Sequence, residues 1–220
     1  MLIQRGEAEL IKCAEDILTD LELKLKPILG KNIPKQLFAN LLIAFRQDVT
    51  KQRYSTYDEL LDYCDYSANP VGRIVLFVFD DRADRHLLLS DKICTALQLA
   101  NFWQDIRVDI LKNRIYIPLE DMSRFGYTES NLHDQQFDDR FAQLMKFQVE
   151  RTRELFEGGK QLLREAVPEL RFELRLTWNG GMKILEKIEQ AKYDVLKSRP
   201  KITMIDKILI LLNSTLNAKT

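Results

Sequence analysis

Apolar residues recur every three to four positions along most of the sequence, which is the spacing of one face of an α-helix. Gly and Pro are few and interrupt this spacing at intervals, so we expect long helices joined by short breaks. The predicted helices cover residues 7–29, 35–51, 56–79, 90–111, 119–125, 140–156, 169–196 and 202–216. The pattern therefore predicts an all-α fold, a single-domain helical bundle over residues 1–220.

Polar and small residues mark where several of these helices begin or break. Thr56 is predicted to cap the helix that starts there, with Glu59 reaching back to complete a capping box. Pro70 removes a backbone donor and Gly72 removes a side chain, so the same helix should bend or break at these residues. Small residues there also allow another helix to approach closely, which is a structural alternative to a ligand cavity. The Asn-Gly-Gly sequence at residues 179–181 predicts a second break, inside the helix over residues 169–196.

Some charged and polar segments are expected to have structural roles only. The Asp-rich sequence at residues 80–84 is interpreted as a solvated loop, and residues 128–138 as a polar linker. Asp48 lies near the C-terminal end of a predicted helix, where the helix dipole disfavours a carboxylate, so we expect an ion pair with Lys51, Lys35 or Arg53. The last helix carries an apolar run too short to span a bilayer, and it forms either part of the core or a surface that touches membrane.

The helix predicted over residues 90–111 combines apolar residues on nearly every side with one line of polar side chains. Asn101, Asp105 and Asp109 are four residues apart and therefore stack along one face, with Gln98 close to the same line. A helix that is apolar nearly all round is buried, so this line should face a cavity. Two carboxylates one turn apart repel each other unless a cation screens them, and such oxygen ligands suit Mg²⁺ shared with substrate phosphates. The line is a candidate Mg²⁺ site, with a structural polar network as the alternative.

The overall charge and the rare residue types exclude several other classes of function. The 33 basic and 33 acidic residues balance, so no basic surface for nucleic acid is expected. The 3 Cys form no CxxC pair and are interpreted as reduced thiols, and the 2 His are too few and too far apart for a His-based metal site. The polar N-terminus is unlike a signal peptide, and no apolar run reaches the length of about 18 residues that a membrane span needs. We therefore expect a cytoplasmic protein.

Two stretches carry a resemblance to a known family. Residues 63–73 read YCDYSANPVGR, and residues 98–118 read QLANFWQDIRVDILKNRIYIP, which contains an Asn-x-x-x-Asp-x-x-x-Asp motif followed by Arg-x-Tyr-x-Pro. With these motifs the chain resembles the squalene/phytoene synthase family of head-to-head prenyl diphosphate synthases. The sequences ANPVGR and NFWQD look most like the hydroxysqualene synthase branch of that family, which belongs to hopanoid pathways. Weaker similarity extends over most of the chain, and the fold implied is the helical bundle of isoprenoid synthases.

The resemblance implies roles for the residues of both stretches. Asn101, Asp105 and Asp109 would hold Mg²⁺ against the diphosphate of a prenyl substrate, either presqualene diphosphate or farnesyl diphosphate. Tyr63 would lie near the reacting carbons and act with the two aspartates as a catalytic residue. The substrate-binding residues that the resemblance implies are Gln98, Ser67, Asn69, Val71, Gly72 and Tyr116. In the hydroxysqualene branch, presqualene diphosphate ionises, its cation rearranges and water captures it; the sequence contains no nicotinamide motif, which suits water rather than hydride.

The sequence departs from the family pattern in two places. The family carries another acidic motif, of the Asp-Asp-x-x-Asp type, in an N-terminal region that has no counterpart here, and residues 80–84 fall in the wrong place to replace it. The bundle is therefore expected to be N-terminally incomplete, lacking the first helices of the family. Gln104 stands where many relatives have Arg before the first Asp of the motif, which would weaken one phosphate contact.

Three alternatives to a hydroxysqualene synthase stay open. A phytoene or presqualene diphosphate synthase would use the same residues for head-to-head prenyl transfer. An inactive remnant, or a subunit that needs the missing region, would explain the single acidic motif. A plain helical bundle would use the polar line structurally. For a hydroxysqualene synthase and for a phytoene or presqualene diphosphate synthase, the expected partner is a prenyl diphosphate. Peripheral contact at the inner face of the membrane through the apolar last helix is expected as well.

Overall fold

A computed structural model describes residues 30–216 of the chain. The chain divides into two units, residues 1–34 and residues 35–220, and every helix of the described range lies in the second unit. The helix predicted over residues 7–29 lies outside the described residues. Between residues 30 and 216 the regular secondary structure is entirely helical, which confirms the all-α prediction for this part of the chain.

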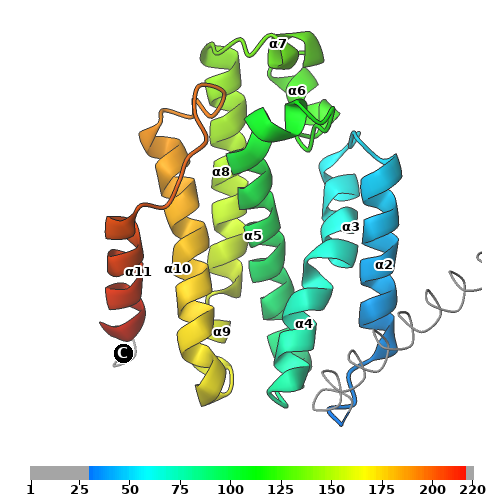
Figure 1. Cartoon of the computed structure of the whole chain (residues 1–220), viewed down its shortest axis with the longest axis vertical. Helices are drawn as coiled ribbons and strands as arrows, with labels where there is room; N and C mark the ends of the chain where they lie inside the picture. The colour runs from blue at the N-terminus through cyan, green and yellow to red at the C-terminus, as the bar shows by residue number, and fades with distance from the viewer. Residues whose placement is uncertain (1–29, 217–220) are drawn as a thin grey trace, which may run out of the picture. The chain divides into compact units, whose positions relative to one another are not determined.

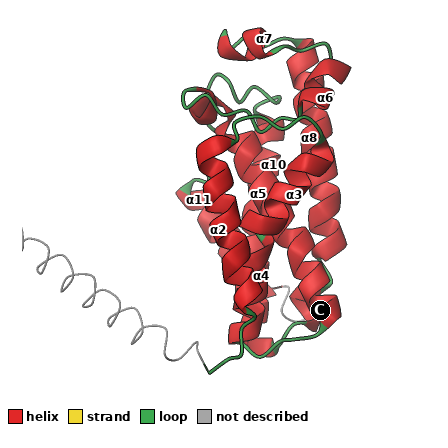
Figure 2. Ribbon diagram, turned by 90° about the vertical axis from the view of Figure 1, so that its right-hand side faces the viewer, coloured by secondary structure: helices red, strands yellow, loops and turns green. Residues whose placement is uncertain are grey.

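The second unit is a bundle of long helices joined by short connections (Figure 1). Its central helix, α5 (Asp84–Ile110), packs against α8, α4 and α10, with α2, α3 and α4 on one side and α10 and α11 on the other. The turned view shows the same helices and the loops that connect them (Figure 2). The remaining helices are α2 (Lys35–Thr50), α3 (Tyr57–Ser67), α4 (Asn69–Val78), α6 (Leu119–Arg124), α7 (Glu129–His133), α8 (Asp139–Gly159), α9 (Leu162–Glu165), α10 (Pro168–Gln190) and α11 (Met204–Leu216).

Helix α5 is buried because apolar side chains cover most of its circumference, as its sequence predicts. Trp103 is fully buried against α8, and its indole Nε1 donates a hydrogen bond to Thr152 Oγ1 at 2.8 Å, so the polar end of the ring is satisfied. Gly159, the last residue of α8, lies so close to α5 that a Cβ there would be 2.5 Å from Ile93 and 2.8 Å from the Leu89 carbonyl oxygen. This close packing holds α5 rigidly in the middle of the bundle.

The helix predicted from residue 56 onwards does break, and it breaks at Ala68, between α3 and α4. Thr56 caps α3 as predicted, since its side chain accepts a hydrogen bond from the Glu59 backbone N–H. Gly72 lies where α4 crosses α5, and a Cβ at this position would clash with Ser90 Oγ and Cys94 Sγ. The glycine therefore serves the helix crossing that the sequence left open as an alternative.

The interpretation of residues 80–84 as a solvated loop is wrong for one residue. Asp80, Arg82 and Asp84 are exposed, but Asp81 is buried. Its carboxylate hydrogen-bonds to His86 Nδ1 at 2.6 Å and accepts a hydrogen bond from the Val167 backbone N–H at 3.0 Å, which ties the start of α5 to the start of α10. Helix α5 begins just after this anchor, at Asp84, six residues before the predicted start.

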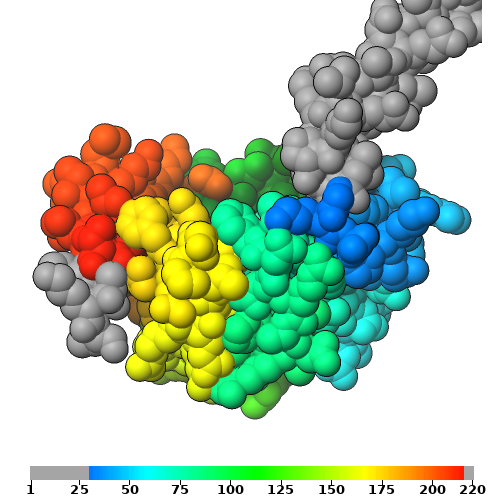
Figure 3. Space-filling model, turned by 90° about the horizontal axis from the view of Figure 1, so that it is seen from below, coloured from blue at the N-terminus to red at the C-terminus, as the bar shows by residue number. Residues whose placement is uncertain are grey.

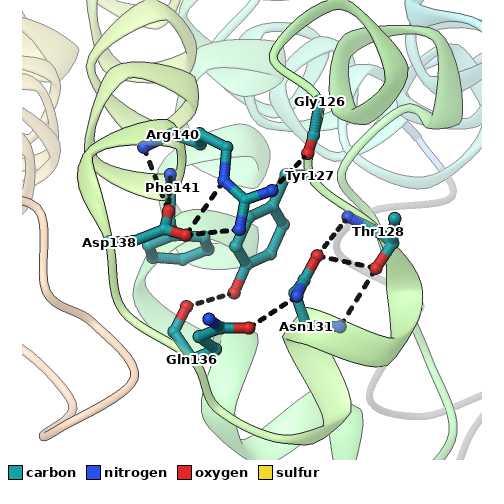
Figure 4. A network of polar contacts seen from close by, with 8 residues as sticks. All are labelled: Gly126, Tyr127, Thr128, Asn131, Gln136, Asp138, Arg140 and Phe141. Atoms are coloured by element: carbon teal, nitrogen blue, oxygen red, sulfur yellow. Dashed lines mark hydrogen bonds and ion pairs between the residues drawn. The ribbon is translucent and has the colours of Figure 1, made fainter.

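The polar segment over residues 128–138 is not a linker, because it contains the short helix α7. Thr128 and Asn131 form a complete capping box at the start of α7. Beyond it, Asn131 Nδ2 donates to Gln136 Oε1, and Tyr127 donates its hydroxyl hydrogen to the Gln136 carbonyl (Figure 4). Arg140 pairs with Asp138 and donates to the Gly126 carbonyl. The polar side chains of this segment are thus used to fold it locally.

The break predicted at residues 179–181 is also absent, since α10 is one continuous helix. Gly181 is buried against α8 and α5, where a Cβ would clash with Phe156 and come within 2.9 Å of Leu97. The glycine is needed for close helix packing, not for a bend.

Helix α11 presents most of its apolar side chains to solvent. Ile210 is buried, whereas six other large apolar residues are between 45 and 71 % exposed: Met204, Ile205, Ile208, Leu209, Leu211 and Leu212. The helix packs against α10 and lies at the edge of the bundle, as the view from below shows in red beside the yellow α9 and α10 (Figure 3). Of the two roles predicted for this helix, the core role is wrong for most of its apolar residues, and contact with a membrane stays a prediction. None of the helices between residues 30 and 216 is long and apolar enough to cross a bilayer.

Candidate active site

The polar line predicted on α5 forms one side of the candidate site. Asn101 is exposed, and Asp105 and Asp109 are half-buried, so all three reach solvent although the residues around them are mostly buried. The helix is regular over this stretch, which places the three side chains on one face at one-turn intervals. Burial, and after it repulsion from Asp105, raises the pKa of Asp109 above its ordinary value.

A basic loop before α11, residues 197–201, lies against the Asp105 end of this line. Arg199 donates from Nε to Asp105 Oδ1 and from Nη2 to Asp105 Oδ2, the latter at 3.2 Å. Two other side chains of α5 hold the backbone of the same loop: Gln104 Nε2 donates to the Pro200 carbonyl at 2.6 Å, and Arg107 donates to the Lys197 carbonyl. Gln104 is buried and therefore positions the loop, a role different from the missing phosphate contact that the sequence suggested.

An open pocket of about 510 Å³ lies between α5, α10 and this loop. Its polar lining combines Asn101 with the cationic side chains of Arg199 and Lys201, and Gly180 of α10 leaves room on the opposite wall. Arg199 and Lys201 can bind an anion in this pocket. The nearby carboxylates of Asp105 and Asp109 can bind a divalent cation that accompanies the anion.

The Asp109 end of the line faces a second group of residues, after the end of α5. Asp109, Arg114 and Tyr116 line one small crevice with Phe102. Lys112, Arg114 and Arg199 lower the pKa of Asp109 and so oppose the upward shift. Arg114 also donates from Nη2 to the backbone carbonyl of Asp48 at 2.8 Å, which joins the end of α2 to this part of the site.

Aromatic rings continue from this crevice into the bundle. Phe102 and Tyr116 stack with ring centroids 3.7 Å apart, and Tyr63 lies 6.1 Å from Phe102 and 6.3 Å from Tyr116. Tyr54 stacks on Tyr116 with ring centroids 5.7 Å apart, and it lies at the same distance from Tyr63. The cluster brings Tyr63, from the first motif stretch, next to the end of the second stretch.

The Tyr63 hydroxyl donates a hydrogen bond to Asp48 Oδ1 at 2.7 Å. Burial, followed by this hydrogen bond and the charge of Asp48, raises the pKa of Tyr63, so the phenol stays neutral. The predicted ion pair of Asp48 is therefore wrong. Lys51 pairs with Glu59 and Arg53 with Glu129 instead.

The other residues predicted to bind substrate are spread over α3, α4 and α5. Gln98 is half-buried one turn before the polar line, and the Ser67 hydroxyl oxygen is buried without a hydrogen-bond partner among the described residues. Asn69 is buried, donating to Asp65 and accepting from Thr95. Val71 is half exposed, and Gly72 lies at the helix crossing described above. Of the predicted set, Tyr116 lines the crevice with Asp109, and Tyr63 lies 6.3 Å from Tyr116 between ring centroids.

The donor set on α5 fits magnesium as part of a site. Mg²⁺ in phosphate-processing proteins is held by one or two carboxylates, with waters and substrate oxygens completing its coordination. Asp105, Asp109 and the Asn101 amide oxygen supply such a set, and the repulsion that raises the pKa of Asp109 is one that a cation would relieve. No group of three or more acidic, His or Cys side chains suitable for a metal occurs between residues 30 and 216. The other acidic motif of the family pattern is therefore not found between residues 30 and 216.

Sequence reasoning did not identify four residues that border the site. Arg114 is part of the Arg-x-Tyr-x-Pro sequence, and this motif could have indicated it. Asp48 offered a weaker signal, as a carboxylate at an unfavourable helix end. Arg199 and Lys201 lie more than 90 residues after Asp105, and no local pattern connects them.

Comparison with known proteins gives a consistent family. The squalene/phytoene synthase family model matches residues 25–206. A hydroxysqualene synthase of Sinorhizobium fredii is 34 % identical over 181 residues, covering 81 % of this chain and 61 % of the relative. A phytoene synthase of Arthrospira platensis is 30 % identical over 200 residues, covering 84 % and 64 %. The crystal structure of a squalene synthase from Alicyclobacillus acidocaldarius superposes with a TM-score of 0.74 at 39 % identity, covering 76 % of this chain and 63 % of that one. The chain thus spans less than two thirds of the length of these relatives.

Proposed function

The chain belongs to the squalene/phytoene synthase family, and from this membership we propose that it supplies the magnesium–diphosphate wall of a prenyl synthase active site. The reaction proposed is that of a hydroxysqualene synthase. Presqualene diphosphate loses its diphosphate by cleavage of the carbon–oxygen bond, and the cyclopropylcarbinyl cation rearranges. Water then adds through its oxygen and releases a proton, which gives hydroxysqualene and diphosphate.

The residues of α5 would hold the diphosphate end of the substrate. Asn101, Asp105 and Asp109 would be the magnesium ligands of this wall, and magnesium would supply Lewis-acid stabilisation of the leaving group. Arg199 and Lys201 line the adjoining pocket and add positive charge for the same anion.

The aromatic cluster would face the carbon skeleton. Electron-rich ring faces attract cations, and Tyr63, Phe102 and Tyr116 lie together at the Asp109 end of the line. The raised pKa of Tyr63 keeps its hydroxyl protonated, so the ring is a neutral donor of π-electron density and not a phenolate that would trap the cation. The single observation that carries the proposal is this adjacency of a carboxylate line and an aromatic cluster. It supports the assignment of Tyr63, Asp105 and Asp109 as catalytic residues.

A phytoene or presqualene diphosphate synthase is the second candidate, because the phytoene synthase of Arthrospira platensis is about as similar as the hydroxysqualene synthase of Sinorhizobium fredii. Both candidates ionise a prenyl diphosphate and would use the same residues, Asn101, Asp105 and Asp109, to hold its diphosphate. A role as a subunit or an inactive remnant is the third candidate.

Product analysis separates these candidates. We expect the chain, incubated with Mg²⁺ and presqualene diphosphate, to release diphosphate and form hydroxysqualene. Formation of phytoene or presqualene diphosphate from the corresponding prenyl diphosphates would support the second candidate. Product formed only with a co-expressed N-terminal region of a relative would support the subunit, and absence of any product under both conditions would leave the inactive remnant.

We also propose that α11 gives the protein peripheral contact with a membrane. Its exposed apolar residues lie on the outside, and its one carboxylate, Asp206, is buried and paired with Lys187 at 2.9 Å. Lys201, just before α11, and Lys207, on α11, are both exposed. The exposed surface of this helix is therefore apolar and cationic. We expect co-sedimentation with vesicles that contain anionic lipid, and loss of it in Ile208→Asp. Equal sedimentation of the two proteins would contradict this surface.

A further inference from the structure

Arg199 forms an ion pair with Asp105, whose carboxylate is a ligand of the proposed metal site. The guanidinium contacts both carboxylate oxygens, one through Nε and the other through Nη2. The same guanidinium lines the pocket beside Asn101. Asp105, a proposed metal ligand, is therefore paired with Arg199, the cation that would bind the diphosphate.

This ion pair lies where it can be exchanged. The side chain of Arg199 is 39 % exposed and that of Asp105 is 30 % exposed, so water screens their attraction. The backbone of the loop, in contrast, is held by Gln104 at Pro200 and by Arg107 at Lys197. The backbone beside Arg199 is therefore fixed, while its side chain lines the open pocket and, among the described residues, forms hydrogen bonds with Asp105 alone.

We propose that Arg199 is an exchangeable counterion of the site: it neutralises Asp105 in the metal-free protein and transfers to the diphosphate when magnesium diphosphate binds. This inference rests on the proposed function. Asp105 and Asp109 repel each other, and either a guanidinium or a divalent cation relieves the repulsion. The planar fork of arginine forms paired hydrogen bonds with carboxylate and with phosphate oxygens alike, so one side chain can serve both partners.

The exchange predicts effects of opposite sign for two ligands. Mg²⁺ alone must displace Arg199 from Asp105 without offering it a new partner. Removal of the guanidinium should therefore strengthen Mg²⁺ binding, by about two- to fivefold for a surface pair. Magnesium diphosphate offers Arg199 an anion, and loss of a charge-assisted hydrogen bond should weaken its binding by about ten- to a hundredfold. A residue with a merely structural role would weaken both.

The test is calorimetric titration of the whole chain with Mg²⁺ alone and with inorganic pyrophosphate at saturating Mg²⁺. Arg199→Gln should bind Mg²⁺ more tightly and pyrophosphate more weakly, and Arg199→Lys should show both effects to a smaller extent. Lys197→Gln, which removes an exposed charge from the same loop, is the matched control and should change neither titration. Urea unfolding of each variant checks that the fold is intact.

The outcomes separate this inference from the proposed function. If the wild-type chain binds magnesium pyrophosphate and Arg199→Gln weakens both titrations, or leaves Mg²⁺ binding unchanged, the exchange is wrong and the site assignment stands. If the wild-type chain binds no magnesium pyrophosphate, the site assignment fails and the exchange fails with it.

Discussion

Asp109→Asn is expected to weaken the binding of magnesium pyrophosphate by at least about 100-fold. Loss of even an outer partner of a metal ligand commonly costs about 10–100-fold, and this substitution removes the charge of a proposed ligand itself. The same change should leave the metal-free protein as stable as the wild type at neutral pH, or more so. Burial and the neighbouring Asp105 raise the pKa of Asp109, which means that its ionised form is disfavoured in the folded state.

Titration calorimetry measures the first effect and urea unfolding without metal measures the second. Asp84→Asn is the matched control, because Asp84 is an exposed carboxylate at the opposite end of the same helix. It should bind magnesium pyrophosphate as the wild type does. Equal binding by wild type and Asp109→Asn would mean that the polar line is a structural network and not a metal wall.

Arg151→Met is expected to lower the free energy of unfolding by about 3–5 kcal/mol, because it leaves a buried carboxylate without its cation. Arg151 of α8 donates to Asp121 Oδ2 of α6 at 2.5 Å, and the two side chains are only 13 % and 6 % exposed. The guanidinium also lies 3.5 Å from the centre of the Tyr57 ring of α3. Burial raises the pKa of Tyr57 to about 12, so the ring remains a neutral partner. One side chain thus connects three helices.

Urea unfolding gives the free energy, and two further variants show that the pair is responsible. Arg151→Met/Asp121→Asn removes both charges and should recover most of the loss, since no isolated charge remains. Glu150→Gln breaks the neighbouring Lys146–Glu150 pair of α8, whose side chains are each 57 % exposed, and should change stability by less than about 0.5 kcal/mol. A loss below about 1 kcal/mol for Arg151→Met would show that solvent reaches the pair.

The positions of most helices followed from local patterns in the sequence. The helix over residues 35–51, the cap at Thr56 and the short helix ending before Gly126 are all observed close to where they were expected. Such signals depend on neighbouring residues and on burial of one helix face, and they survive in almost any tertiary setting.

The errors occur where a tertiary contact overrides a local signal. A Gly-Gly pair within a helical pattern often marks a bend, but α10 is continuous here. Phe156 fills the space beside Gly181, so the glycine serves close packing. Asp81 belongs to a charged run that is typical of a loop, yet the Val167 N–H and His86 compensate its burial. Residues 128–138 are polar enough for a linker, and their side chains bond to one another and form α7 instead.

The sequence by itself determined that Asn101, Asp105 and Asp109 share one face of a buried helix, because the four-residue spacing and the helical period fix that relation locally. Only the tertiary structure decided what surrounds the line. Arg199 reaches Asp105 from a loop 94 residues away, and Tyr63 and Tyr116 meet around Phe102 because α3, α5 and the segment after α5 pack together. Contacts of this kind depend on how helices pack, which no short-range spacing encodes.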